Sequence, residues 1–127
     1  MARIPGQGSN WIRRSTRLAI YERDGHRCTY CGCKVRPGRG TKGAWAAHLD
    51  HVVPCELGGD SRPDNLVTAC RTCNDAKAAL PLHGFLRNLA GRGVNVATVA
   101  ARVRAAVASP LTPALRARGR ALAAAGK

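Results

Sequence analysis

The chain has 127 residues and a formal net charge of +14 at pH 7, because 21 Lys and Arg residues outnumber 7 Asp and Glu residues. A chain of this length forms one domain with a modest core. Only 4% of its residues are aromatic, so we expect the fold to need a further staple. No apolar run is long enough to span a membrane, and residues 1–10 do not resemble a signal peptide. We therefore expect an intracellular protein that is neither secreted nor bound to membranes.

The charges are unevenly distributed along the chain. Residues 1–42 carry ten basic residues against two acidic ones, and residues 81–127 carry eight basic residues and no acid. Residues 43–80 carry three basic residues against five acidic ones. Basic flanks around an acidic centre favour a polyanion that is held by its phosphates while a cation lies at the centre, which indicates nucleic acid. The alternative is a basic surface that binds acidic partners nonspecifically.

Residues 1–14 form a basic arm that we expect to be flexible. Ser15 or Thr16 can cap a helix that continues to about Arg23. Gly25 then breaks this helix and lets the chain turn into a first pair of cysteines.

Two Cys-x-x-Cys pairs follow, Cys28 with Cys31 and Cys70 with Cys73. Each pair supplies two thiolates from a tight turn, and two such turns complete a tetrahedral sulfur site for one structural Zn²⁺ ion. Bound zinc contributes on the order of 10 kcal/mol to folding, which would offset a thin core.

The cysteine count leaves an alternative open. Six cysteines are an even number, as in the disulfide frameworks of small secreted proteins, but the composition of residues 1–10 favours zinc. Cys33 and Cys55 are left over, and we interpret both as ordinary thiols, although Cys33 could compete with Cys31 for the metal.

The centre of the chain predicts a strand, loop, strand, helix unit. Its parts are a basic glycine-rich loop at 34–43, a strand at 44–53, a loop around 58–63, a strand at 66–68 and a helix at 74–80. The first strand carries His48, Asp50 and His51, and Asn74 directly follows Cys73. A zinc knuckle alone does not need these polar groups.

Residues 81–127 are rich in Ala and Arg at helical spacing. Helices are predicted at 81–90, from the cap Asn95 to Ala108, and after the cap Thr112 with Pro113 at the first position. Valines at 96, 99, 103 and 107 form one apolar stripe. We expect this stripe to pack within its own domain, with partner binding as the alternative.

Seven short elements, in this order over about residues 17–80, resemble the HNH endonucleases. They are Arg23-Asp24-Gly25 before Cys28, Tyr30-Cys31-Gly32, Asp50-His51-Val52-Val53-Pro54, Gly58-Gly59, Asn65-Leu66, Cys70-Arg71-Thr72-Cys73-Asn74, and Lys77. The resemblance implies an α+β protein with a ββα-metal core, a structural zinc held by four cysteines, an N-terminal helix and a helical C-terminal extension. We divide the chain into an arm at 1–14, a nuclease core at 15–80 and a basic extension at 81–127.

The same resemblance implies cleavage of DNA phosphodiester bonds with the help of a divalent cation. His51 would be the general base, because an imidazole can take a proton from water at neutral pH. Asp50 and Asn74 would offer oxygen ligands to one Mg²⁺ or Mn²⁺ ion. Asn65 would orient the base through hydrogen bonds to the loop that carries it. Some members have a histidine where this chain has Ala78, so the metal has few protein ligands.

The roles of the remaining polar residues are less defined. By strand alternation His48 shares a face with Asp50, so it is a third metal ligand, a phosphate contact or a packed strand histidine. We expect contacts to DNA phosphates from five basic residues, namely Lys77, Arg71, Arg13, Arg14 and Arg17. The net charge predicts binding to double-stranded DNA with little sequence specificity.

Two hypotheses compete with the nuclease. One is a zinc-stabilised DNA-binding module without catalysis. The other is an accessory protein of a phage DNA-packaging or recombination machine, because the basic arm and helical tail resemble those of small phage-encoded members. A phage origin would place the protein in the cytoplasm of a bacterial host. No motif in the chain predicts an oligomeric state.

Overall fold

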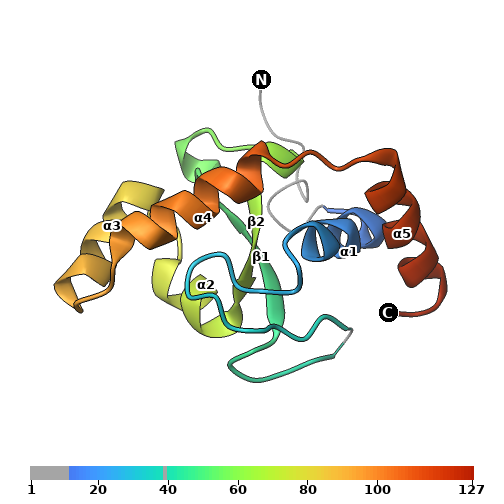
Figure 1. Cartoon of the computed structure of the whole chain (residues 1–127), viewed down its shortest axis with the longest axis horizontal. Helices are drawn as coiled ribbons and strands as arrows, with labels where there is room; N and C mark the ends of the chain where they lie inside the picture. Colours follow the sequence, from blue (N-terminus) through green and yellow to red (C-terminus); the bar gives the residue numbers. More distant parts are fainter. Residues whose placement is uncertain (1–11, 39) are drawn as a thin grey trace.

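The computed structural model describes residues 12–38 and 40–127 and shows helices packed around a two-stranded sheet (Figure 1). In chain order the elements are α1 (Arg14–Arg23), β1 (Ala47–His51), two short 3-10 turns (Cys55–Leu57 and Pro63–Asn65), β2 (Leu66–Cys70), α2 (Arg71–Lys77), α3 (Leu82–Gly91), α4 (Val96–Ala108) and α5 (Pro113–Ala124). Most of the predicted arm, residues 1–11, lies outside the described residues. Within the described residues no helix is long and apolar enough to cross a membrane.

The centre of the molecule is a hairpin followed directly by a helix. β1 and β2 pair antiparallel, with Asp50 opposite Val67 and His51 opposite Leu66. All five residues of β2 are buried, as expected for a short apolar run inside a domain. α2 follows β2 without a linker. This arrangement confirms the predicted α+β class with a ββα core.

Three boundaries in this unit differ from the prediction. β1 covers 47–51 rather than 44–53, β2 continues beyond residue 68 to Cys70, and the helix spans 71–77 rather than 74–80. The helix begins early because the Cys70 sulfur accepts a hydrogen bond from the Cys73 amide, 3.3 Å away, and so caps it. It ends early because Ala78 has a φ of +48°, which an α-helix does not accommodate.

The first helix ends at Arg23, as predicted, but it begins at Arg14. The cap position is Arg13, which makes no side-chain cap. The prediction that Ser15 or Thr16 caps this helix is therefore wrong, since both already lie in its first turn.

A buried ion pair joins the end of α1 to the second strand. Arg23 Nε lies 2.8 Å from Asp24 Oδ1, and the Nη1 and Nη2 atoms of Arg23 donate to the carbonyls of Pro63 and Leu66. Asp24 Oδ2 accepts a hydrogen bond from the Thr68 amide at 2.9 Å. These charge-assisted hydrogen bonds fix α1 against β2, and they explain why Arg and Asp stand side by side before Gly25.

The C-terminal extension shares its core with the hairpin. Phe85 of α3 and Val99 and Val103 of α4 belong to the same buried cluster as Cys28 and Tyr30. The Tyr30 and Phe85 rings meet edge to face with centroids 5.1 Å apart, an arrangement that aromatic quadrupoles favour. The predicted core role of the valine stripe is confirmed, with its central valines buried and those at 96 and 107 half-buried.

The caps of the last two helices are as predicted. Asn95 Oδ1 accepts a hydrogen bond from the Thr98 amide at 3.3 Å, and Thr112 Oγ1 accepts one from the Leu115 amide at 3.2 Å. Pro113 occupies the first turn of α5, where its missing amide hydrogen is not needed.

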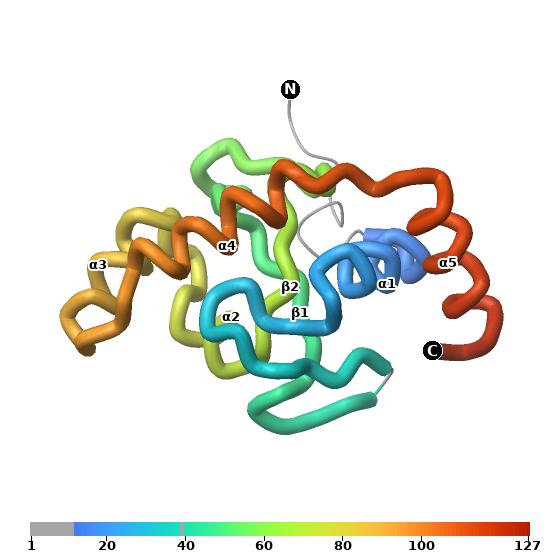
Figure 2. The backbone as a smooth tube through the Cα atoms, viewed as in Figure 1, coloured from blue at the N-terminus to red at the C-terminus, as the bar shows by residue number. Residues whose placement is uncertain are grey.

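The last helix returns to the first. After α4 the chain runs across to α5, which lies beside α1 (Figure 2). The contact is closest at Gly119, where an added Cβ atom would lie 2.2 Å from the carbonyl oxygen of Ser15 and 3.0 Å from Cβ of Ala19. Only glycine permits this approach of the two backbones.

Candidate active site and metal centre

The four cysteines of the two Cys-x-x-Cys pairs converge on one point. Their sulfur atoms all lie within 4.8 Å of one another, and Cys31 Sγ lies 3.9 Å from Cys70 Sγ. In a tetrahedral site with Zn–S bonds of about 2.3 Å the sulfurs are about 3.8 Å apart. Cys28, Cys31, Cys70 and Cys73 therefore form a cluster that is suited to zinc.

Both cysteine turns present their sulfur in the same way. The Cys31 amide donates to Cys28 Sγ at 3.4 Å, and the Cys73 amide donates to Cys70 Sγ at 3.3 Å. A side-chain hydrogen bond with Cys73 lowers the pKa of Cys28 to about 5, and the same bond raises the pKa of Cys73. Burial raises the pKa of Cys70. The cluster thus favours one thiolate on its own, and four thiolates require a cation to neutralise them.

The two leftover cysteines lie outside this group of four sulfurs. The backbone carbonyl of Cys33 accepts a hydrogen bond from the Cys28 amide at 2.8 Å, so Cys33 supports the knuckle through its backbone. Burial is the largest cause that raises the pKa of its thiol. Cys55 begins the first 3-10 turn and lines a different cavity.

That cavity has a volume of about 260 Å³ and opens beside β1 and α2. Its polar lining comes from Arg17, His48, Asp50, His51, Glu56 and Asn74. Four of these six residues were predicted as catalytic or metal-binding residues, and Arg17 was predicted to contact DNA. The fold therefore brings the predicted polar residues from α1, β1 and α2 to one cavity.

His51 is the last residue of β1 and is only 7% exposed. Its Nε2 atom lies 3.0 Å from Ser61 Oγ, so the hydroxyl holds the imidazole in place. Sequence reasoning did not identify Ser61, because an isolated serine in a polar loop carries no signal.

Asn65 closes the loop that follows His51. Its Oδ1 atom accepts a hydrogen bond from the Val53 amide at 2.9 Å, and its Nδ2 atom donates to the carbonyls of Val53 and Asp60. Gly59 lies in the same closure, where a Cβ atom would be 1.7 Å from the Val53 carbonyl oxygen. Glycine is thus required at 59, and Asn65 binds both ends of the loop behind His51.

Asp50 lies at the bottom of the cavity and is 4% exposed. Its Oδ2 atom accepts a hydrogen bond from the Tyr30 hydroxyl and lies 3.1 Å from Lys77 Nζ. Burial raises the pKa of this carboxyl group, while the Lys77 ammonium and the Tyr30 hydroxyl act in the opposite direction. A carboxylate has about four acceptor positions, so Asp50 can hold both partners and still offer an oxygen to the cavity.

The position of Lys77 contradicts the prediction that it contacts DNA phosphate. Its side chain is fully buried, and Nζ donates to the His51 carbonyl at 2.8 Å in addition to its ion pair with Asp50. An ammonium group this deeply buried is retained only with such partners. Lys77 therefore links α2 to the two central residues of the cavity.

Asn74 and His48 complete the cavity. Asn74 lies in the middle of α2, not at its beginning as predicted, and it is half-buried. His48 is half-buried too, and burial is the largest cause that lowers the pKa of its imidazole. His48 is therefore neutral at pH 7, which is the form that binds metals.

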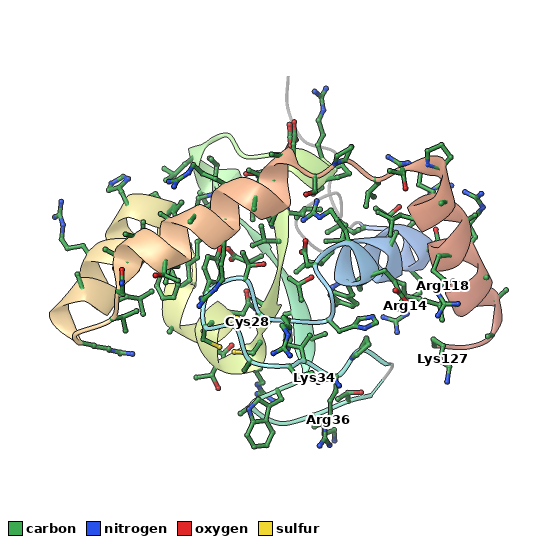
Figure 3. All side chains as sticks on the ribbon, in the orientation of Figure 1. Arg14, Cys28, Lys34, Arg36, Arg118 and Lys127 are labelled. Atoms are coloured by element: carbon green, nitrogen blue, oxygen red, sulfur yellow. The ribbon has the colours of Figure 1, made fainter. Side chains whose placement is uncertain are left out.

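The remaining predicted DNA contacts have different environments. Arg13 and Arg71 are exposed, and Arg71 lies 3.6 Å from Asp75. Arg14 Nε donates to the Lys127 carbonyl at 2.8 Å, which brings α1 to the end of the chain (Figure 3). The predicted five do not form one surface.

The hairpin with its following helix, the polar cavity and the cysteine cluster define a ββα-metal protein stabilised by a zinc-type site. Residues 28–79 match the family model described as HNH endonuclease. The chain therefore contains an HNH endonuclease domain at residues 28–79, and such domains imply DNA binding or cleavage with a metal. No curated protein and no solved structure matches the chain.

Proposed function

We propose that the protein is a metal-dependent endonuclease that hydrolyses phosphodiester bonds of double-stranded DNA. The observation that carries the proposal is the shared cavity, which is lined by His48, Asp50, His51 and Asn74 within a matched HNH domain. Individually these residues have structural explanations, but a site is defined by a constellation of groups in one cavity.

His51 is the proposed general base. It would take a proton from the attacking water, for which an imidazole with an ordinary pKa near 6.5 is suited at neutral pH. Ser61 and the loop closed by Asn65 hold its ring and backbone. Asn65 acts through the loop and is therefore a positioning residue.

Asp50, Asn74 and His48 would hold a divalent cation. Two hard oxygen donors favour Mg²⁺ or Mn²⁺, and the few protein ligands leave positions for water and phosphate oxygens. When bound, this cation supplies charge stabilisation for the phosphorane-like transition state and the leaving oxygen. Lys77 keeps Asp50 ionised and oriented in a buried place, so we assign it a positioning role in place of the predicted DNA contact.

A second function is favoured by one observation. The Asp50 carboxylate already has two partners, Tyr30 and Lys77, so Asp50 also fits a purely structural role. In that case the protein would be a zinc-stabilised DNA-binding module without catalysis, used intracellularly by a larger DNA-processing machine such as a phage packaging complex.

The test is to incubate supercoiled plasmid with Mg²⁺ or Mn²⁺ and the wild-type protein or His51→Ala. We expect wild type to nick or linearise the plasmid and the variant to lose about 10²-fold to 10⁴-fold in rate, the usual contribution of a general base. Equal rates for the two proteins, with DNA binding retained, would exclude the nuclease and favour the binding module.

A further inference from the structure

A second polar cavity lies outside the HNH domain, between α1 and α5. It has a volume of about 300 Å³. We call it the arginine pocket, and its lining consists of Arg13, Ser15, Thr16, Ala19, Arg116 and Arg120. Three guanidinium groups and two hydroxyl groups thus face one space, and among the described residues no carboxylate lines it.

The charges of the arginine pocket are not balanced by the protein. Within residues 12–38 and 40–127, the side chains of Arg13, Arg116 and Arg120 take part in no ion pair or hydrogen bond. Their neighbour Arg118 on α5 behaves differently, because its Nε atom lies 3.3 Å from Glu22 of α1. Like charges that gather in one pocket without a counter-charge favour the binding of an anion.

The packing of the helices holds this pocket in place. Gly119 lies against Ser15 at the closest approach of α5 to α1, and Arg116 and Arg120 stand on either side of it in the sequence. The pocket is therefore built by a tight backbone contact and not by mobile side chains alone. Figure 3 shows the basic residues Arg14, Arg118 and Lys127 gathered around the same pair of helices.

The arginine pocket lies close to the candidate active site along α1. Arg13 lines the pocket, and Arg17, one helical turn later, lines the cavity that contains His51. Four helical residues rise about 6 Å, which is about two steps of 3.4 Å along one strand of duplex DNA. A strand with one phosphate at His51 can therefore place a nearby phosphate in the pocket.

We propose that the arginine pocket binds a phosphodiester group of the DNA backbone, a few nucleotides from the bond at His51. The guanidinium fork matches phosphate oxygens in pairs, and the Ser15 and Thr16 hydroxyls can donate further hydrogen bonds. This proposal rests on DNA being the substrate of the nuclease. It assigns the C-terminal helix to substrate binding, and such a contact would position DNA without reading its sequence.

The test compares two double variants in a His51→Ala background, so that DNA stays uncut. Arg116→Ala/Arg120→Ala removes the pocket charges, and Arg92→Ala/Arg104→Ala removes two equally exposed charges elsewhere in the extension. Binding of a labelled duplex is measured by fluorescence anisotropy over a series of salt concentrations. We expect the pocket variant to bind on the order of tenfold more weakly at physiological salt and to lose about two from the slope of log affinity against log salt. The control pair should change both by much less, and Arg116→Lys/Arg120→Lys should retain the slope.

Two results would overturn the proposal. Equal weakening by both alanine pairs would mean that only total charge matters, and unchanged binding in the pocket variant would mean that DNA does not reach the pocket. Inorganic phosphate serves as a further probe by NMR of the arginine side chains. If phosphate shifts Arg116 and Arg120 while the variant binds DNA like wild type, the pocket takes a free anion instead. Because His51→Ala is used throughout, absence of plasmid cleavage by the parent protein would refute the nuclease without deciding this binding result.

Discussion

The cysteine cluster and the polar cavity are built on the same hairpin and helix, but they differ in chemistry. The cluster offers four soft sulfur atoms and has no place for a further ligand. The cavity offers oxygen and nitrogen atoms of Asp50, Asn74 and His48 and stays open at about 260 Å³. A closed site holds structure together, whereas an open one leaves room for substrate. Cys73 and Asn74 are adjacent, so one turn of α2 belongs to both.

This difference indicates how a thin core can support a reactive site. The cluster ties the turn at Cys28 to the beginning of α2, and α2 in turn carries Asn74 and Lys77 against β1. The cavity itself contains partly desolvated polar groups, which do not favour folding. We therefore expect damage to the cluster to unfold the domain and damage to the cavity to spare the zinc.

The largest effect is expected for Cys70→Ser, which removes a buried ligand of the cluster. Since structural zinc contributes on the order of 10 kcal/mol, the variant should lose both its zinc and its cooperative unfolding transition. Zinc content and circular dichroism during thermal unfolding measure this. Cys55→Ser is the matched control, because its half-buried thiol lies outside the four sulfurs. Unchanged zinc and stability in Cys70→Ser would contradict the structural cluster.

The next effect concerns the buried pair of Lys77 and Asp50. Lys77→Met should destabilise the protein by about 3 kcal/mol, because it leaves a buried carboxylate without its counter-ion. Adding Asp50→Asn removes that charge and should restore part of the stability. Urea unfolding of the two single variants and the double variant gives the coupling. Strictly additive losses would show that the two groups do not stabilise each other.

A smaller effect is expected for the loop that Asn65 closes. Asn65→Asp keeps the acceptor for the Val53 amide but loses the donor to the carbonyls of Val53 and Asp60. It should cost about 1 to 3 kcal/mol of stability and lower the cleavage rate while leaving zinc content and DNA affinity unchanged. Plasmid cleavage and duplex binding, measured on the same preparation, separate these effects. A normal rate would remove Asn65 from the list of positioning residues.

The smallest effect is a dependence of stability on pH. Burial lowers the pKa of His48 below its ordinary 6.5 in the folded state, and the charges of Arg17 and Arg71 act in the same direction. As the pH falls below 6.5, the unfolded chain therefore takes up this proton first, and the folded state loses stability. Wild type should lose more stability than His48→Gln between about pH 7 and pH 5.5 in urea unfolding. Parallel losses would show that His48 titrates equally in both states.

The sequence predicted the features that depend on local spacing. The Cys-x-x-Cys turns, the caps Asn95 and Thr112, and the ββα order all follow from residues a few positions apart. The partners of Lys77 and Arg23 could not be predicted in this way, because Lys77 meets Asp50 27 residues away and Arg23 meets Leu66 43 residues away. Lys77 on a predicted surface helix therefore suggested a phosphate contact, whereas tertiary packing turned it into the core. The arginine pocket likewise depends on how α5 returns to α1, which no motif encodes.

The most direct test of the central claim is to measure zinc content and plasmid cleavage in one preparation of Asn74→Ala. Asn74 adjoins Cys73 but lines the cavity, so this variant separates the two sites at their closest point in the sequence. The account predicts one zinc per chain, a normal unfolding transition, and cleavage in Mg²⁺ or Mn²⁺ reduced by at least about tenfold. Unchanged cleavage, or loss of zinc together with activity, would contradict the division between a structural cluster and a catalytic cavity.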